Sequence, residues 1–157
     1  MTQVEFSGIV LNGGNSSRMG TPKGEINFLG RPLIERSIDA LNEAGASEVL
    51  IVGGKPFVEE SKGLRFVEDV HPGEGPLGGL ITGLQNARMS QAMVLSNDLM
   101  SIDGSTIRKI LEYSPMADLT IPIASEVPQV LTALWKVSCL KILESAFKSG
   151  SRSLKSI

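Results

Sequence analysis

Two cations lie in a glycine-rich segment near the start of the chain, in a pattern that suits anion binding. The segment is residues 12–23, with the sequence NGGNSSRMGTPK. Glycine pairs let the backbone come close to a ligand and turn successive N–H groups into one concavity. Arg18 adds a planar, forked donor and Lys23 adds a point charge, which together suit the oxygens of a triphosphate. The segment therefore predicts a cradle for the phosphates of a nucleotide.

Two familiar phosphate-binding patterns do not fit this segment. Lys23 is followed by glycine, so the pattern is not G-x-x-x-x-G-K-[ST], and the glycine spacing is not G-x-G-x-x-G either. The plain alternative is a turn at Gly13-Gly14 with solvated charges at Arg18 and Lys23, because glycine-rich turns are common.

An acidic residue, Asp98, follows the run 93–96 and is separated from it only by Asn97. Mg²⁺ in proteins is held by one or two carboxylates together with substrate phosphates, so one well-placed aspartate is enough to recruit the ion with a nucleotide. The alternative is that Asp98 caps the next helix or forms a turn with Asn97. Together with the phosphate cradle, we favour Asp98 as a magnesium ligand.

A third segment, residues 68–80, is rich in glycine and proline and runs into a predicted helix at Pro76. Backbone groups of such a loop can contact the edge of a base, and Asp69 can accept hydrogen bonds from base or ribose donors. Taken alone, the segment would equally fit a plain connection between a strand and a helix.

Strands and helices alternate along the chain and must bring these segments together. We expect strands at residues 5–11, 48–52, 64–67, 92–96, 119–123 and 130–135. We expect helices from Pro32 to Gly45, from Pro76, around 107–113, and over 140–148, ending at Gly150. Such alternation is typical of a single α/β domain, residues 1–157, with a doubly wound, mostly parallel sheet. Ligands bind such sheets beyond the carboxyl ends of the strands, so these loops should converge there.

Composition limits the function classes. The chain has 157 residues, 41% hydrophobic and 20% charged, with a formal net charge of −2, so nothing favours nucleic-acid or membrane binding. The single cysteine, Cys139, excludes an intramolecular disulfide. There is no long apolar run and no secretory pattern, so we expect a cytoplasmic protein.

The whole opening string resembles the nucleotidyltransferase signature L-x-G-G-x-S-x-R-M-G-x-x-K. With residues 69–79, Asp98 and the segments 128–136 and 150–154, the chain resembles the molybdenum cofactor guanylyltransferase family. That family transfers GMP from Mg²⁺-GTP to molybdopterin and releases pyrophosphate, on a Rossmann-like fold of the nucleotide-diphospho-sugar transferase type. The resemblance implies that the Gly-Pro-Leu-Gly-Gly stretch at residues 75–79 favours guanine. It also implies that the partners are GTP and molybdopterin, together with proteins of cofactor biosynthesis or enzymes that accept the cofactor.

The resemblance also implies roles for individual residues. Arg18 and Lys23 would hold phosphates and Asp98 would bind Mg²⁺, which makes these three the candidate catalytic residues. The implied nucleotide-binding residues are Leu11, Asn12, Gly13, Gly14, Ser16, Lys23, Gly53, Asp69, Gly75, Pro76 and Leu77.

Four departures from the family pattern keep alternatives open. Asn12 stands where the family usually has alanine, Asn97 where it has cysteine, and Gly53 where it has a base-contacting asparagine. The family's Asn-x-Asn-Thr-x-x-Asp motif, expected after residues 150–154, is not in the 157 residues. The alternatives are a catalytically weak nucleotide-binding or regulatory protein, and a transferase that uses CTP or a sugar phosphate.

Overall fold

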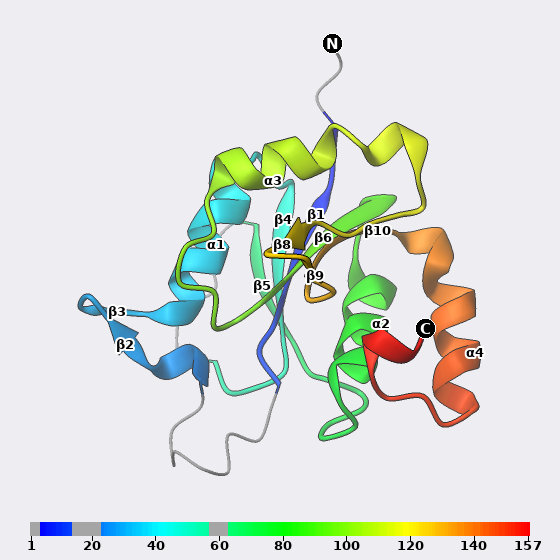
Figure 1. The fold of residues 1–157 in the computed structure, drawn as a ribbon. Coiled ribbons are helices and arrows are strands. Elements are labelled where there is room, and N and C mark those ends of the chain that lie inside the picture. The colour runs from blue at the N-terminus through cyan, green and yellow to red at the C-terminus, as the bar shows by residue number, and fades with distance from the viewer. Residues whose placement is uncertain (1–3, 14–22, 57–62) are drawn as a thin grey trace.

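A six-stranded sheet forms the centre of the molecule (Figure 1). The computed structural model describes residues 4–13, 23–56 and 63–157. The strand order is β5-β4-β1-β6-β10-β7. The four parallel strands are β1 (Ser7–Leu11), β4 (Glu48–Val52), β5 (Leu64–Val67) and β6 (Gln91–Ser96). β10 (Thr132–Lys136) runs antiparallel to β6, and β7 (Leu119–Thr120) runs antiparallel to β10. The predicted doubly wound, mostly parallel sheet is confirmed.

Helices cover both faces of this sheet. α1 (Leu33–Glu43) and α3 (Gly104–Leu111) lie on one face, and α2 (Pro76–Asn86) and α4 (Leu140–Lys148) lie on the other (Figure 1). Side chains of β1 alternate between the two layers: Val10 joins the core under α1 and α3, while Ile9 and Leu11 join the core under α2 and α4. Every residue of β1 is buried, as expected for a parallel strand covered on both sides.

Proline and glycine mark the helix ends where the sequence predicts them. Pro32 directly precedes α1, and Gly45 follows it with φ +89°. Gly150 follows α4 with φ +100°. α3 begins at Gly104, earlier than predicted, because the Asp103 side chain accepts a hydrogen bond from the Thr106 N–H (2.8 Å) and caps the helix.

The predicted strand at 119–123 is wrong in its extent. β7 ends at Thr120, and Ile123 instead belongs to a small hairpin of β8 (Ile123–Ala124) and β9 (Val127–Pro128). Pro122 lies between the two and has no N–H to donate to a sheet ladder. A second hairpin, β2 (Asn27–Phe28) with β3 (Arg31–Pro32), projects from the molecule before α1 (Figure 1).

Four short 3-10 turns complete the described elements: η1 (Lys23–Glu25), η2 (Ser114–Met116), η3 (Val137–Cys139) and η4 (Leu154–Ser156). None of the helices in the described part of the chain has the length and apolar character needed to span a membrane.

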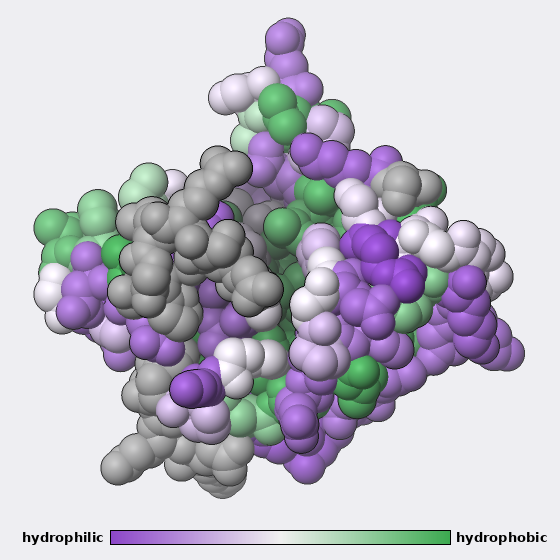
Figure 2. All heavy atoms as spheres, turned by 90° about the horizontal axis from the view of Figure 1, so that it is seen from below, coloured by the Kyte–Doolittle hydropathy of each residue, from purple (hydrophilic) through white to green (hydrophobic). Residues whose placement is uncertain are grey.

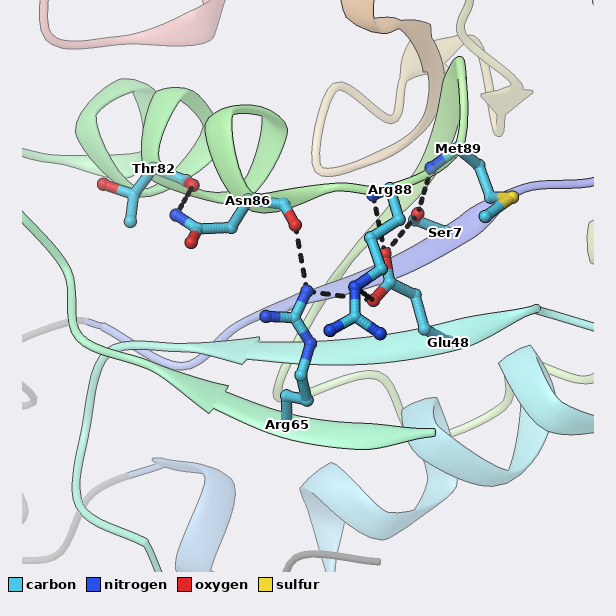
Figure 3. Close-up of polar contacts among 7 residues, drawn as sticks. All are labelled: Ser7, Glu48, Arg65, Thr82, Asn86, Arg88 and Met89. Carbon is cyan, nitrogen blue, oxygen red and sulfur yellow. Dashed lines mark hydrogen bonds and ion pairs between the residues drawn. The ribbon is translucent and has the colours of Figure 1, made fainter. Parts of the chain in front are cut away.

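A buried carboxylate ties strands together at their amino ends (Figure 3). Glu48 accepts hydrogen bonds from the Ser7 hydroxyl (2.8 Å) and the Arg88 backbone N–H (2.7 Å). Arg65 Nη2 lies 2.9 Å from Glu48 Oε2 and also donates to the Asn86 carbonyl at the end of α2. We call Ser7, Glu48, Arg65 and Arg88 the Glu48 clasp. It lies at the opposite edge of the sheet from the strand ends where a ligand is expected.

Candidate active site

The carboxyl ends of β1, β4, β5 and β6 open into a cavity of about 360 Å³. Figure 2 views the molecule from this side, and the face is hollowed near its middle. Because parallel strands all end at the same edge, the loops that follow them are brought together here, as the sequence predicts. The cavity is lined by Leu11, Gly13, Lys23, Val52, Asp69, Gly73, Gly75, Pro76, Gly79, Ser96, Asn97, Asp98 and Leu131.

Two opposite charges of the site lie close together in the lining of this cavity. Lys23, at the start of η1, places Nζ 3.5 Å from Oδ2 of Asp98, which follows β6. The side chains are 57% and 39% exposed, so water screens the pair and the contact contributes little to stability. Both groups are therefore available to a charged ligand.

The Asp98 carboxylate suits a magnesium ion that arrives with phosphates. The Ser96 hydroxyl donates to its Oδ1 (2.9 Å) and orients the group. Within the described ranges, no three His, Cys, Asp or Glu side chains lie close enough together to hold a metal ion by themselves. A single oriented carboxylate at the cavity fits Mg²⁺, which takes its other ligands from phosphates and water.

Asp69 uses its two carboxylate oxygens differently. Oδ1 accepts from the His71 N–H (2.9 Å) and lies 3.0 Å from the hydroxyl of Thr82 on α2. Oδ2 lies toward Gly13 and Gly79, where an added Cβ would be 3.7 and 3.8 Å from it. In the described part of the chain no donor reaches Oδ2, so this oxygen can accept a hydrogen bond from a ligand.

The C-terminal segment braces the glycine-rich loop before α2. The Arg152 carbonyl accepts from the Leu77 N–H (3.3 Å), and an added Cβ at Gly75 would lie 2.8 Å from that carbonyl oxygen. The Arg152 side chain pairs with Glu74 (2.7 Å) and stacks over the Phe147 ring at 4.0 Å. Segments more than 70 residues apart in sequence therefore shape one wall together.

The predicted site residues fall into three groups. Leu11, Gly13, Lys23, Asp69, Gly75, Pro76 and Asp98 all line the cavity. Asn12, Gly53 and Leu77 lie next to these residues but are not part of the lining, and the side chains of Asn12 and Leu77 are buried. Gly14, Ser16 and Arg18 lie outside the described residues.

Leu131 lines the cavity and was missed at the sequence level. It precedes β10, whose first residue, Thr132, pairs with Leu95 near the carboxyl end of β6. An antiparallel strand starts at the edge where its parallel neighbours end. Residues that precede β10 therefore reach the cavity, whereas the rule about carboxyl ends selects only residues that follow a strand. Ser96, Val52, Gly73 and Gly79 also line the cavity, and each is adjacent to a predicted loop or lies within one.

The fold and the site together define an α/β protein with a ligand cavity at the carboxyl ends of a doubly wound sheet. The profile of the family described as the MobA-like NTP transferase domain matches residues 8–157. The chain belongs to this family and is a nucleotidyltransferase.

Named relatives agree with this assignment. The chain is 34% identical to the probable molybdenum cofactor guanylyltransferase of Chloroflexus aggregans, over 96% of this chain and 74% of the relative. It is 32% identical to the molybdenum cofactor guanylyltransferase of Xanthomonas euvesicatoria, over 99% and 79%. The crystal structure of molybdopterin-guanine dinucleotide biosynthesis protein A from Archaeoglobus fulgidus shares the fold, with a TM-score of 0.75, 21% identity, and coverage of 96% and 77%.

Proposed function

We propose that this chain transfers GMP from GTP to molybdopterin with the help of Mg²⁺, which yields molybdopterin guanine dinucleotide and pyrophosphate. The observation that carries the proposal is that Lys23, Asp69 and Asp98 open onto one cavity at the carboxyl ends of the strands. Relatives that bear the name molybdenum cofactor guanylyltransferase support the choice of substrates.

The reaction requires positioning and charge stabilisation rather than a covalent enzyme intermediate. An oxygen of the molybdopterin phosphate attacks the α-phosphorus of GTP, the bond from that phosphorus to the bridging oxygen breaks, and pyrophosphate leaves with the electron pair. Lys23 would hold the phosphates and offset the charge on the leaving group. Arg18, which lies outside the described residues, would add a forked donor. Asp98 would hold Mg²⁺, which when bound supplies positive charge at the phosphates.

The lining residues around Asp69 suit the nucleoside. Asp69 Oδ2 can accept from the N–H groups of guanine or from a ribose hydroxyl. Leu11, Gly75 and Pro76 supply apolar contact and open backbone beside it. Asn12, Gly53 and Leu77 would act by holding the loops that carry these contacts.

A thermal-unfolding panel tests the nucleotide and the metal together. Wild type and Asp98→Ala are heated with GTP, CTP, ATP or UTP, each with and without Mg²⁺. A ligand at 100 times its Kd stabilises by about 2.7 kcal/mol, which raises the midpoint of a domain of this size by roughly 5 to 10 °C. We expect GTP with Mg²⁺ to give the largest rise, and Asp98→Ala to remove its metal-dependent part.

Asp118→Ala is the matched control, since it removes an exposed carboxylate that pairs with Lys136 and does not line the cavity. Release of pyrophosphate on adding molybdopterin then separates a transferase from a protein that only binds nucleotide. A larger shift with CTP than with GTP would overturn the assignment of the base, and saturation with GTP without pyrophosphate release would overturn transfer.

A further inference from the structure

The side chain of Asn12 is buried directly behind the cavity and has both of its polar atoms paired. It is 7% exposed, and it follows β1 with its N–H bonded to the Val52 carbonyl (2.8 Å). Its Nδ2 donates to the Gly53 carbonyl (3.3 Å), and its Oδ1 accepts from Asn97 Nδ2 (2.8 Å). One amide therefore links the loop after β1 to the loops after β4 and β6.

Two glycines enclose this pair of amides. A Cβ added at Gly54 would lie 2.3 Å from Asn12 Nδ2, and one added at Gly24 would lie 2.7 Å from Asn12 Oδ1 and 3.0 Å from Asn97 Nδ2. Gly24 is itself buried. Only glycine leaves room for the two amides, so their separation and direction are fixed by packing as well as by hydrogen bonds.

The amides also have a fixed sense of hydrogen bonding. The Gly53 carbonyl can only accept, so Asn12 must present Nδ2 to it and Oδ1 to Asn97. Asn97 must then present Nδ2 to Asn12, which holds its amide in one of its two orientations. Asn97 lines the cavity, whereas Asn12 does not.

Two charged residues of the site lie next to this pair and its enclosing glycines in the sequence. Lys23 directly precedes Gly24, and Asp98 directly follows Asn97. These charges come from segments 75 residues apart, and their own contact is long and exposed (3.5 Å). The bond between Asn12 and Asn97 is shorter (2.8 Å) and partly buried, so it is a firmer connection between the two loops than the ion pair itself.

We propose that Asn12 and Asn97 form a positioning pair that holds Asp98 and Lys23 at the spacing needed for metal-bound phosphates before the nucleotide arrives. The inference rests on the proposed function, because it names how the same site is preorganised. Neither residue needs to react, and Asn12 acts on the loop that carries Asp98 through its hydrogen bond to Asn97.

A double-mutant cycle tests the pair. Asn12→Ala, Asn97→Ala and the double variant are compared with wild type for the Kd of Mn²⁺, measured by electron paramagnetic resonance in the presence of GTP. Partners that orient a metal ligand typically contribute 10- to 100-fold in affinity, so we expect Asn12→Ala to weaken Mn²⁺ binding by about 10-fold or more. The double variant should be little worse than either single variant, because each change breaks the same connection.

Asn42→Ala on the exposed end of α1 is the control and should leave the Kd unchanged. The thermal midpoint without ligand is measured in parallel, so that the titrations are done on folded protein. Asn97 is less buried than Asn12. If Asn12→Ala does not fold, the Kd of Mn²⁺ is therefore compared between wild type and Asn97→Ala alone.

The results separate this inference from the proposed function. If wild type binds no GTP, the proposed function fails, and the positioning role fails with it. If wild type binds GTP and Mn²⁺ but the folded variants bind Mn²⁺ equally well, only the positioning role is overturned and the pair is structural. A weaker Kd in both single variants without further loss in the double variant supports the pair.

Discussion

At the scale of single residues, one carboxylate oxygen of Asp69 stabilises the fold and the other lies toward the cavity. Oδ1 is held by the His71 N–H and lies beside the Thr82 hydroxyl, whereas Oδ2 lies toward Gly13 and Gly79. The bonds to Oδ1 fix the loop that follows β5 against α2. The position of Oδ2 is therefore set before a ligand binds, which is what an acceptor for a base or ribose requires.

Asp69→Asn is expected to weaken nucleotide binding without unfolding the loop. The amide oxygen can replace Oδ1 toward His71 and Thr82, which places an N–H₂ donor where the cavity now has an acceptor. Loss of a hydrogen bond to a charged group should lower GTP affinity by about 10-fold or more. Isothermal titration measures this, with the neighbouring exposed acid changed in Glu68→Gln as control. An unchanged affinity would show that Asp69 does not face the nucleotide.

At the scale of elements, α2 is held at both ends, and this couples the cavity to the far edge of the sheet. The Leu77 N–H in its first turn donates to the Arg152 carbonyl, and the carbonyl of its last residue, Asn86, accepts from Arg65 of the Glu48 clasp (Figure 3). The clasp itself depends on charge. Burial by itself would raise the pKa of Glu48, but hydrogen bonds from Arg88, Arg65 and Ser7 outweigh it and hold the pKa below its ordinary value.

This lowered pKa predicts how stability depends on pH. A carboxylate with a depressed pKa stabilises the fold above its unfolded pKa, about 4.3, and the stabilisation is lost as pH falls through the folded pKa. Glu48→Gln should lower the free energy of unfolding by about 1 to 2 kcal/mol at neutral pH, since its arginine partners are partly exposed.

As the pH is lowered from neutral into the acid range, the free energy of unfolding should fall less for Glu48→Gln than for wild type. Urea unfolding at several pH values between 7 and 3 measures both effects. Glu112→Gln, an exposed acid at the end of α3, is the control and should follow wild type. Parallel pH curves for Glu48→Gln and wild type would contradict the role given to the clasp.

At the scale of the whole molecule, one sheet is shared by two hydrophobic cores. Residues of β1, β4 and β6 alternate between the core under α1 and α3 and the core under α2 and α4. Loss of either core would expose one face of β1, β4 and β6, and the same strands also form the other core. We therefore expect the chain to unfold in one cooperative transition.

The single tryptophan, Trp135, lies in the core under α2 and α4, so its fluorescence reports on that face. Leu41→Ala creates a cavity on the opposite face and should cost about 2 to 5 kcal/mol. Fluorescence and far-ultraviolet circular dichroism should then shift to the same lower midpoint. Separate midpoints for the two signals would show that the two layers unfold independently.

The sequence by itself determined the four helices, the main strands of the central sheet and the edge of that sheet where the site lies. Short aliphatic runs, the apolar spacing of the helices and their proline and glycine boundaries are local features, and each predicts its own element. The order of strand and helix then implies a parallel sheet, and parallel strands place Lys23, Asp69 and Asp98 at one edge.

The tertiary structure alone decided which side chains share that edge and how they are held. The antiparallel direction of β10 brings Leu131 to the cavity, and the hydrogen bond between Asn12 and Asn97 joins residues 85 positions apart. The Glu48 clasp likewise unites residues from four separate segments. These pairings depend on which strands become neighbours and on the space left between their loops, and no local pattern of residues specifies that.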